Sequence, residues 1–583
     1  MTIQQNPSIE EYTKRIGVSQ RKLPADLVIK NGKIINVYTL EIISADIAIA
    51  DGYIAAIGEN YEGLQVIDAD GCFLSPSFID GHIHIESTNL TPSEFAKAVL
   101  PHGVTTIITD PHEIANVLGK KGIEYMLNNA EGLPMDIFYV LPSSVPATSF
   151  EHAGALLKAE DLKPFYDHPS VIGLAEVMDY PAVMNADSDM LHKIKDAAHY
   201  SGLIDGHLAG LSTNEINGYL SVGIRNDHEC TTAAEALERV RLGMRVMIRQ
   251  GSGSKNLPAL LEAVNEKNAS RFSFCTDDKH IDELIEEGSI NHCVKEAIAL
   301  GLDPLTAYQM GTLNAAQVYQ LHDRGAISPG MKADILVVSD LEKVDIKTVI
   351  KDGKVIAHNS ALIKEWPHTT SGLEGCVESV NMKPITVTDL KIKPEEAIAN
   401  IIEIIPNQIV TRHTKSTVPT DSEGYFLPSA EQDLQKLVVA ERHHARGTLG
   451  ACIVKGFNLT PDSAIASTVA HDSHNIIAAG TSDEAIMKAI DWLNDHQGGF
   501  AVVKDGKVIG AMELRLAGLM SIKPMKEAAA EMETIQHALK VVSPSASFHL
   551  FSILSFLALP VIPALKLTDI GLFNVRTFSH IKV

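Results

Sequence analysis

The sequence predicts an α/β protein with a (β/α)₈ barrel, a small β-sandwich built from the chain on both sides of the barrel, and a C-terminal mixed α/β domain. Three observations predict it. Eight apolar runs of strand length alternate with helical stretches between residues 72 and 325. Two hairpin-rich segments flank that region, and a region with its own strands and helices follows residue 375. Apolar runs alternating with helices are typical of a parallel sheet, and eight such units form a closed barrel.

The two flanking segments share one sequence pattern, in which turn dipeptides separate β-rich runs. Asn31-Gly32 and Asp51-Gly52 separate β-rich runs, and Asp352-Gly353 does the same after the barrel region. An Asn-Gly or Asp-Gly pair between such runs is the strongest short-range hairpin signal. We therefore expect one β-sandwich domain made of residues 1–71 and 326–375. The catalytic barrel would span 72–325 and the C-terminal α/β domain 376–583.

Polar residues close each apolar run of the predicted barrel. The eight runs are FLSPSFIDGHIH, VTTIITDPHE, DIFYVLPSS, VIGLAEVMD, GLIDGHLAG, GIRNDHE, RVMIRQGS and RFSFCTDD. In a (β/α)₈ barrel the C-terminal ends of the strands form the active-site face. Thr91 to Glu94 resembles a capping box that opens the first barrel helix. The pattern predicts a functional site at the barrel mouth.

Composition excludes several classes of protein. With 45% hydrophobic and 21% charged residues the chain is neither disordered, collagen-like nor embedded in a membrane. Its 49 basic and 73 acidic residues leave a net charge of −24. Such a charge repels phosphate backbones and anionic lipids, so we expect neither nucleic acid nor a membrane surface as a partner. A small neutral substrate remains compatible, and we expect a homo-oligomer, a dimer.

Three features favour the cytoplasm. The six cysteines are dispersed and form no C-x-x-C pair, which suits a reducing compartment. Residues 1–15 are polar and lack the apolar run of a secretory signal. The most apolar run, residues 550–567, is interrupted by Pro560 and Pro563 and is too short for a spanning helix. We expect a buried strand or helix there.

The first barrel run ends in Gly81-His82-Ile83-His84. On a strand, residues i and i+2 point to the same side, so both imidazoles can face one ion. Taken alone, an H-x-H pair is a weak signal and is more often two solvated loop histidines. Four further potential ligands close later runs: Glu176, His207, His228 and Asp277. Six such residues at one barrel mouth predict a metal centre.

FIDGHIHIES, followed by His, His and Asp at later strand ends, resembles the amidohydrolase superfamily over roughly residues 25–370. The stretch from SPSFIDGH to IANVLG closely resembles bacterial adenine deaminases, as do GLAEVMDYPAV, IDGHLAGL, RNDHE, FCTDDKH and the tail FLALPVIPALKLTDIGL. This narrower resemblance covers nearly the whole chain. It implies hydrolysis of free adenine to hypoxanthine and ammonia, in purine salvage or catabolism. It also implies two divalent metal ions, Mn²⁺ first and Fe²⁺ as the other candidate.

The resemblance assigns His82, His84 and Asp277 to one metal, and His207 and His228 to the other. Glu176 would bridge the two. Hydantoinase-like relatives use a carbamylated lysine at that strand end, but VIGLAEVMDY contains no lysine. The alternative, another amidohydrolase acting on a cyclic C–N bond (hydantoinase or imidazolonepropionase type), is therefore disfavoured. A catalytically dead scaffold barrel would be expected to lose ligands, and none is missing.

The predicted chemistry accounts for these residue types. A divalent metal lowers the pKa of bound water from 15.7 towards ~7 and so supplies hydroxide. Attack at C6 of the purine loads electron density onto N1, which must be protonated while the amine leaves as ammonia. A carboxylate beside the water can move its proton, and Asp277 is the candidate. Asp278 next to it either contacts the substrate region or caps the strand.

Two further segments carry potential site residues. In TDPHEI the resemblance suggests that Glu113 or His112 meets the purine edge or an accessory metal; the alternative is a polar loop that starts a helix. In AHDSHN three polar residues lie together, His471, Asp472 and His474. They could form a second metal site, but we favour a structural or pocket-covering role.

Overall fold

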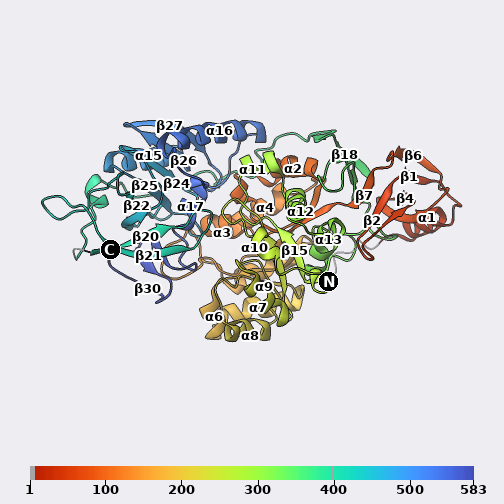
Figure 1. Cartoon of the computed structure of the whole chain (residues 1–583), viewed down its shortest axis with the longest axis horizontal. Helices are drawn as coiled ribbons and strands as arrows, with labels where there is room; N and C mark the ends of the chain where they lie inside the picture. The colour runs from red at the N-terminus through yellow and green to blue at the C-terminus, as the bar shows by residue number, and fades with distance from the viewer. Residues whose placement is uncertain (1–6, 396–397) are drawn as a thin grey trace.

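The computed structural model describes residues 7–395 and 398–583. Three bodies follow one another along the long axis: the β-rich flanking part at one end, the barrel in the middle and the C-terminal region at the other end (Figure 1). Residues 1–6, part of the stretch on which the absence of a secretory signal was predicted, lie outside the described residues. Within the described ranges, no helix combines the length and apolar character that crossing a membrane requires.

The barrel consists of parallel strands with helices outside. Its strands are β8 (Phe78–Ile83), β9 (Val104–Thr109), β10 (Asp136–Leu141), β11 (Val171–Val177), β12 (Ile204–Gly206), β13 (Asn226–Asp227), β14 (Arg245–Arg249) and β15 (Phe272–Cys275). β8 to β12 form one sheet and β13 to β15 another. The chain after β15 closes the ring onto β8, because the Asp277 amide donates to the His82 carbonyl at 2.9 Å. At the other seam the Gly206 amide donates to Asn226 Oδ1 at 3.0 Å. The predicted eight-stranded barrel is confirmed.

The barrel helices alternate with these strands. They are α2 (Pro92–Val99), α3 (His112–Leu118), α4 (Lys120–Asn129), α5 (Ala159–Leu162), α6 (Tyr180–Met184), α7 (Ser188–Tyr200), α8 (Thr213–Ser221), α9 (Ala233–Arg241), α10 (Leu257–Leu261), α11 (Ile281–Glu287), α12 (Ile290–Ala299), α13 (Pro304–Met310) and α14 (Leu313–Val318). Thr91 precedes α2 as predicted, but its side chain makes no capping hydrogen bond with a described residue. Glu94 instead binds Lys97 Nζ and the Met525 amide, both at 2.8 Å. The predicted capping box is therefore wrong, because Glu94 contacts the C-terminal region.

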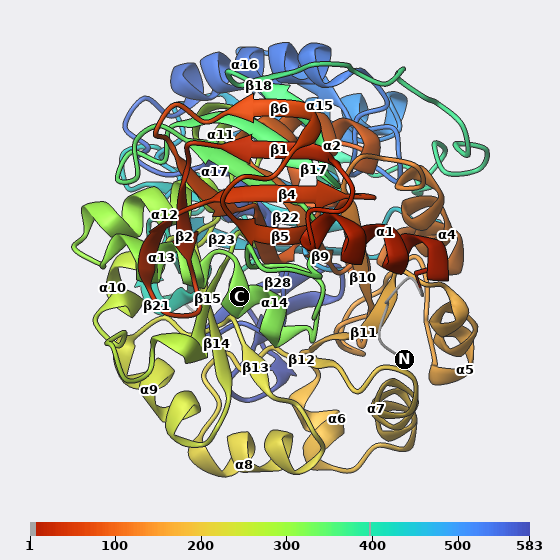
Figure 2. The ribbon, with the colours of Figure 1, turned by 90° about the vertical axis from the view of Figure 1, so that its right-hand side faces the viewer.

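The flanking part contains two sheets (Figure 2). Their strands come from the chain segments before and after the barrel. One has the order β5 (Tyr53–Gly58), β4 (Asp46–Ala50), β1 (Ala25–Lys30), β6 (Gly63–Asp68). The other has the order β19 (Ala361–Leu362), β18 (Lys354–His358), β17 (Ile346–Lys351), β16 (Ile335–Val338), β7 (Phe73–Pro76), β2 (Lys33–Asn36), β3 (Glu41–Ser44). Helix α1 (Ile9–Ser19) precedes them. β7 and β16 pair antiparallel, which joins the two flanks. The fold class is confirmed, while the domain boundaries stay predictions.

The C-terminal region is a mixed α/β domain. Its main sheet has the order β21 (Thr411–Thr417), β20 (Ile398–Ile404), β23 (Leu449–Lys455), β22 (Leu434–Ala440), β25 (Ile476–Gly480), β24 (Ser463–Ser467), β26 (Gly499–Lys504), β27 (Lys507–Glu513). A smaller sheet holds β28 (Leu565–Thr568), β29 (Gly571–Asn574) and β30 (Ser579–His580). The helices are α15 (Asp483–Asp495), α16 (Met525–Val542) and α17 (Leu550–Phe556). The apolar run 550–567 forms buried α17 and β28, as predicted.

Candidate metal centre

Four side chains converge at the carboxyl ends of β8, β11 and β15. Because His82 and His84 are two residues apart on β8, their rings reach the same side, with Nε2 atoms 3.2 Å apart. Glu176 Oε1 lies 2.9 Å from His82 Nε2 and 2.8 Å from His84 Nε2. Asp277 Oδ1 lies 3.2 Å from His84 Nε2. All four side chains are buried. We call these four residues the first half of the centre.

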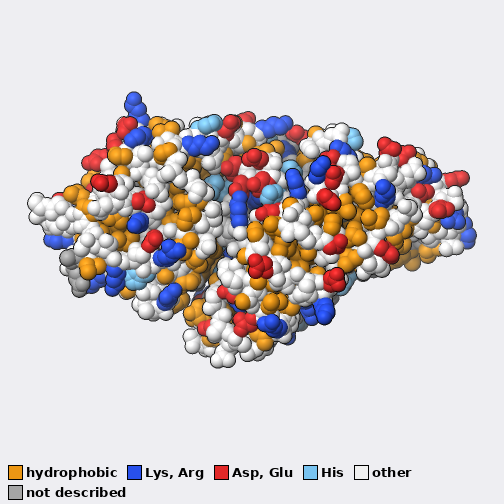
Figure 3. All heavy atoms as spheres, viewed as in Figure 1, with side chains coloured by type: hydrophobic (Ala, Val, Ile, Leu, Met, Phe, Trp, Pro, Cys, Tyr) orange, Lys and Arg blue, Asp and Glu red, His pale blue; other side chains and the backbone are white. Residues whose placement is uncertain are grey.

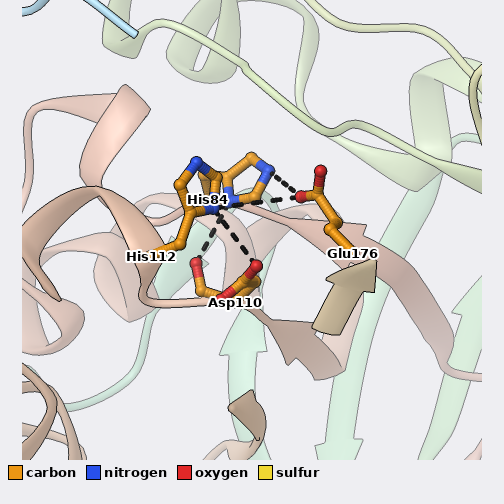
Figure 4. Close-up of side chains that lie close together, drawn as sticks. All are labelled: His84, Asp110, His112 and Glu176. Atoms are coloured by element: carbon orange, nitrogen blue, oxygen red, sulfur yellow. Dashed lines mark hydrogen bonds and ion pairs between the residues drawn. The ribbon is translucent and has the colours of Figure 1, made fainter. Parts of the chain in front are cut away.

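The ring orientation of His84 suits a metal ligand. Its Nδ1 lies 3.1 Å from the Asp110 carbonyl oxygen, which can only accept, so Nδ1 carries the proton. The lone pair of the neutral ring is then on Nε2, the atom that faces Glu176 (Figure 4). Metal-ligating histidines usually donate their second ring nitrogen in this way, which holds the ring in place.

The second half of the centre is formed by His207 and His228, which follow β12 and β13. His207 Nδ1 lies 3.0 Å from Glu176 Oε2, and His228 Nε2 lies 3.7 Å from the same oxygen. The His228 ring stacks on that of His82 with centroids 4.1 Å apart. Each oxygen of Glu176 therefore faces a different pair of histidines, the arrangement expected of a bridging carboxylate.

Several buried polar atoms of the centre lack a hydrogen-bond partner among the described residues. They are His82 Nδ1, Glu176 Oε1, His207 Nε2, and both ring nitrogens of His228. Of these atoms, Glu176 Oε1 and His228 Nε2 face the other ligands of the centre. An unsatisfied buried polar atom costs about 1–3 kcal/mol, so these two call for a bound group. Imidazole nitrogens and carboxylate oxygens are together the ligands of first-row divalent metals. The residues therefore fit a divalent metal ion.

Asp277 is held by a cation that sequence reasoning missed. Arg249, at the end of β14, donates from Nη1 to Asp277 Oδ2 at 2.7 Å and also pairs with Glu229. Burial alone would raise the pKa of Asp277, but the Arg249 guanidinium and His84 lower it well below its usual range. The backbone of Asp277 has φ of 57°, a strained conformation of the kind found at functional sites. Arg249 ends a predicted strand, so the strand-end rule could have found it.

The loop after β9 brings its two predicted site residues to the same mouth. His112 Nδ1 lies 3.2 Å from Asp110 Oδ2 and 4.0 Å from Glu176 Oε1 (Figure 4). Glu113 Oε1 accepts from Ser87 Oγ at 2.6 Å, and the same hydroxyl contacts Asp278. Asp278 therefore faces the site. No local sequence signal pointed to Ser87.

Glu113 is unusually hard to ionise. Burial first, and then the neighbouring carboxylates of Glu86 and Asp278, raise its pKa well above its usual range. Burial therefore favours the protonated form of Glu113, whereas Arg249 favours the ionised form of Asp277. The mouth thus offers both a proton donor and a proton acceptor.

The segment between β24 and β25 extends from the C-terminal domain to this loop. His471 Nδ1 lies 3.9 Å from Glu113 Oε1, and His474 Nε2 lies 4.0 Å from Glu113 Oε2. Asp472 Oδ1 lies 3.5 Å from His112 Nε2. The structure therefore brings AHDSHN together with TDPHEI, although more than 350 residues separate them in the chain.

Comparison with known proteins places this geometry in a family. Residues 73–356 match the model of the amidohydrolase family, and residues 408–579 match that of the adenine deaminase C-terminal domain. The adenine deaminase of Bacillus subtilis (strain 168) is 50% identical over 578 residues, covering 98% of this chain and 99% of that protein. The chain belongs to the adenine deaminase family. The adenine deaminase of Geobacillus kaustophilus (strain HTA426) is 51% identical over 571 residues, 98% of each chain.

Family membership confirms the resemblance seen in the sequence. The adenine deaminase of Lysinibacillus sphaericus (strain C3-41) matches at 48% identity over 99% of both chains, so the C-terminal domain belongs to the shared architecture. The hydantoinase-type alternative is not favoured. Within this member of the adenine deaminase family, the structure gathers all six predicted ligands at one barrel mouth. The role of each residue stays a proposal.

Proposed function

We propose that the protein hydrolyses adenine to hypoxanthine and ammonia, in purine salvage or catabolism, at a centre of two divalent cations. The observation that carries the proposal is the position of Glu176. Its two oxygens face two separate histidine pairs at the barrel mouth. The proteins that resemble this chain over its whole length are adenine deaminases.

In this proposal His82, His84 and Asp277 would hold one cation, His207 and His228 would hold the other, and Glu176 would be a ligand of both. Mn²⁺ is our first candidate and Fe²⁺ the second, as the resemblance to bacterial adenine deaminases implies, and imidazole and carboxylate ligands are compatible with both. A divalent cation supplies two things here, a lowered pKa of coordinated water (towards ~7) and stabilisation of developing negative charge.

Glu176 is suited to bridging as an unmodified carboxylate. Burial alone would raise its pKa, but the nearby rings of His84 and His82 lower it well below its usual range. It is therefore ionised at neutral pH, with one oxygen for each histidine pair. β11 contains no lysine, so the bridge requires no carbon dioxide.

Asp277 is the proposed proton acceptor. Arg249 occupies Oδ2, so Oδ1, which faces His84, is the oxygen left to take a proton from the attacking water and pass it to the leaving amine. Arg249 thus positions Asp277 and keeps it ionised between turnovers. Glu113, whose raised pKa favours the protonated form, is the proposed donor to N1 of the purine as C6 becomes tetrahedral, and it regains a proton from the C6 hydroxyl when the amine leaves and the carbonyl forms. Asp278 is proposed to contact the substrate with its carboxylate, and His112 with the face of its ring, because its two nitrogens face Asp110 and Asp472.

The first experiment compares substrates. Mn²⁺-loaded protein is incubated with adenine, adenosine, AMP and hydantoin, while hypoxanthine absorbance and ammonia release are followed. We expect turnover of adenine, with adenosine and AMP as poor substrates and hydantoin inert. A comparable kcat/KM for adenosine would refute the free-base specificity, and turnover of hydantoin alone would replace the proposed reaction.

Asp277→Asn tests the proton acceptor. The variant keeps the volume and one coordinating oxygen but cannot take a proton, so kcat should fall by at least ~100-fold while much of the metal is retained. Metal content, melting temperature and kcat are measured on one sample. A metal-replete variant with nearly wild-type kcat would remove Asp277 from the mechanism. The predicted homodimer and cytoplasmic location stay predictions.

A further inference from the structure

A second group of ligand atoms lies where the barrel loop meets the C-terminal domain. His112, His471 and Asp472 each place one potential ligand atom within 4.8 Å of the others, and all three residues are buried. Asp472 Oδ1 is 3.5 Å from His112 Nε2 and 3.8 Å from His471 Nδ1. These separations join one residue of the barrel to two residues of the other domain.

In the neutral form of the His112 ring, which a metal ligand must adopt, the lone pair is on the nitrogen that faces this group. Its Nδ1 lies 3.2 Å from the carboxylate oxygen Asp110 Oδ2, so Nδ1 carries the proton of the neutral ring. Nε2 is then the acceptor atom, and it is buried without a hydrogen-bond partner among the described residues, as is Asp472 Oδ2. A carboxylate that orients the second nitrogen of a histidine is a common feature of metal sites.

The neighbouring His474, in contrast, has no lone pair on the ring nitrogen that faces Glu113. His474 Nε2 lies 4.0 Å from Glu113 Oε2, but its Nδ1 accepts the Ala470 backbone N–H at 3.2 Å. Nε2 of that neutral ring therefore carries the proton and has no lone pair for a metal. His112, His471 and Asp472 are therefore better suited to bind a metal than the group formed by Glu113, His471 and His474.

The spacing suits a single atom between the three residues. Ligands bound to one ion at about 2.0–2.2 Å lie roughly 3.0–3.6 Å apart, so the observed 3.5 and 3.8 Å require shifts of only a few tenths of an ångström. A purine ring does not fit a gap of that size. Two imidazoles and one carboxylate select a first-row divalent cation over Mg²⁺ or Ca²⁺, which prefer oxygen ligands.

We propose that His112, His471 and Asp472 form an additional site for a divalent transition-metal cation, separate from the strand-end centre, which fastens the C-terminal domain to the barrel mouth. The His112 ring stands between the two sites, since its Nδ1 lies 4.0 Å from Glu176 Oε1 while its Nε2 faces Asp472. The site does not depend on the reaction that the strand-end centre catalyses.

The test measures how many Mn²⁺ ions each protein binds per chain. Wild-type protein, Asp472→Asn and His471→Gln are dialysed to equilibrium against Mn²⁺, and the metal-to-chain ratio is measured by elemental analysis. His443→Gln is the matched control, because His443 Nε2 contacts the Ser473 carbonyl of the same segment at 2.7 Å and is not among the three proposed ligands. We expect both ligand variants to bind one ion per chain fewer than wild type, with the control unchanged.

Equal ratios in all four proteins would overturn the proposal and leave His112 and Asp472 as an ion pair. Because the result is a difference, it holds whether the strand-end centre takes one ion or two. Thermal unfolding shows whether the variants are folded. In the same measurement, Mn²⁺ should raise the Tm of wild type more than that of the nearly isosteric Asp472→Asn. An equal Mn²⁺-induced rise in both proteins would also count against the site.

Discussion

The two halves of the strand-end centre differ in how closely their ligands approach. In the first half, the Nε2 atoms of His82 and His84 lie within 2.9 Å of Glu176 Oε1. In the second half, only His207 comes as near as 3.0 Å to Oε2, while His228 stays at 3.7 Å. The first half takes two ligands from one strand, whereas the second takes one from each of two short strands. Alternate positions along one strand therefore build the half with the closer ligand atoms.

The surroundings of the halves differ in charge as well. Glu229 Oε1 lies 3.8 Å from His207 Nδ1 and 3.6 Å from His228 Nε2, and it is paired with the buried Arg249. Arg249 also donates to Asp277 of the first half, so its charge acts on both halves. The second half, however, has only two histidines besides Glu176, one carboxylate fewer than the first half. We therefore expect the cation of the second half to be bound more weakly and to leave first.

The largest expected effect comes from the residue that both halves share. Glu176→Gln keeps the shape but removes the negative charge that faces two cations. Both ions should be held less tightly, and kcat/KM should fall by more than the ~10–100-fold typical of changes outside the ligand set. Metal content and rate are measured together. Bicarbonate should leave wild-type reconstitution unchanged; a requirement for it would mean that the bridge is misassigned.

A matched pair of variants separates the halves. We expect His82→Gln to lose the tighter ion and to be the more impaired, because its ring contacts both Glu176 and His228. His228→Gln should keep one ion and regain part of its rate in excess Mn²⁺. Equilibrium dialysis and kcat at rising Mn²⁺ concentration measure both. Equal losses in the two variants would mean that the halves are equivalent.

The sequence predicted the first half best because its signal is local. His82 and His84 share one strand, and Glu176 and Asp277 end other recognisable strands, so the barrel topology alone brings them together. The contact of His112 with Asp472 could not be predicted, since no pattern in either segment encodes a contact between two domains. For the same reason the sequence did not predict that Glu94 accepts a hydrogen bond from the Met525 amide instead of completing a capping box.

Arg249 tests how charge controls Asp277. Arg249→Gln should cut kcat by about 10–100-fold and shift the acidic limb of the kcat/KM profile to higher pH, because the pKa of Asp277 rises once the guanidinium is gone. It also leaves Glu229 buried and unpaired, at a cost of roughly 3–5 kcal/mol in stability. The double variant with Glu229→Gln should recover stability but not the pH profile. An unshifted profile would make Arg249 purely structural.

The smallest expected effect is a pH dependence of stability caused by Lys566, which lies outside both halves of the centre. Lys566 is fully buried and donates to the carbonyls of Ile409 and Phe556 at 2.7 Å, and burial lowers its pKa to about 7. Between pH 7 and about 10 the unfolded state binds the extra proton, so wild-type stability should rise with pH relative to Lys566→Met, by at most ~1.4 kcal/mol per pH unit. Below pH 7 the difference should level off. Denaturant unfolding across this range measures it, and parallel curves would contradict the lowered pKa.

The low basicity of Lys566 concerns the stability of the C-terminal domain, so activity of Lys566→Met at pH 7.5 should be close to wild type. The face shown in Figure 3 carries both acidic and basic side chains in its described part, and the net charge of the whole chain is −24. Changes at the centre should therefore appear in metal content and rate, and changes at Lys566 in stability.

The central claim is that adenine is deaminated by a divalent metal held at these strand ends. The most direct measurement follows hypoxanthine and ammonia from adenine with one protein preparation in three states: as purified, after chelator treatment and dialysis, and after return of Mn²⁺. The account predicts equimolar hypoxanthine and ammonia in the first state, no turnover in the second and recovery in the third, proportional to the metal bound. Full turnover of adenine by rigorously metal-free protein would contradict it.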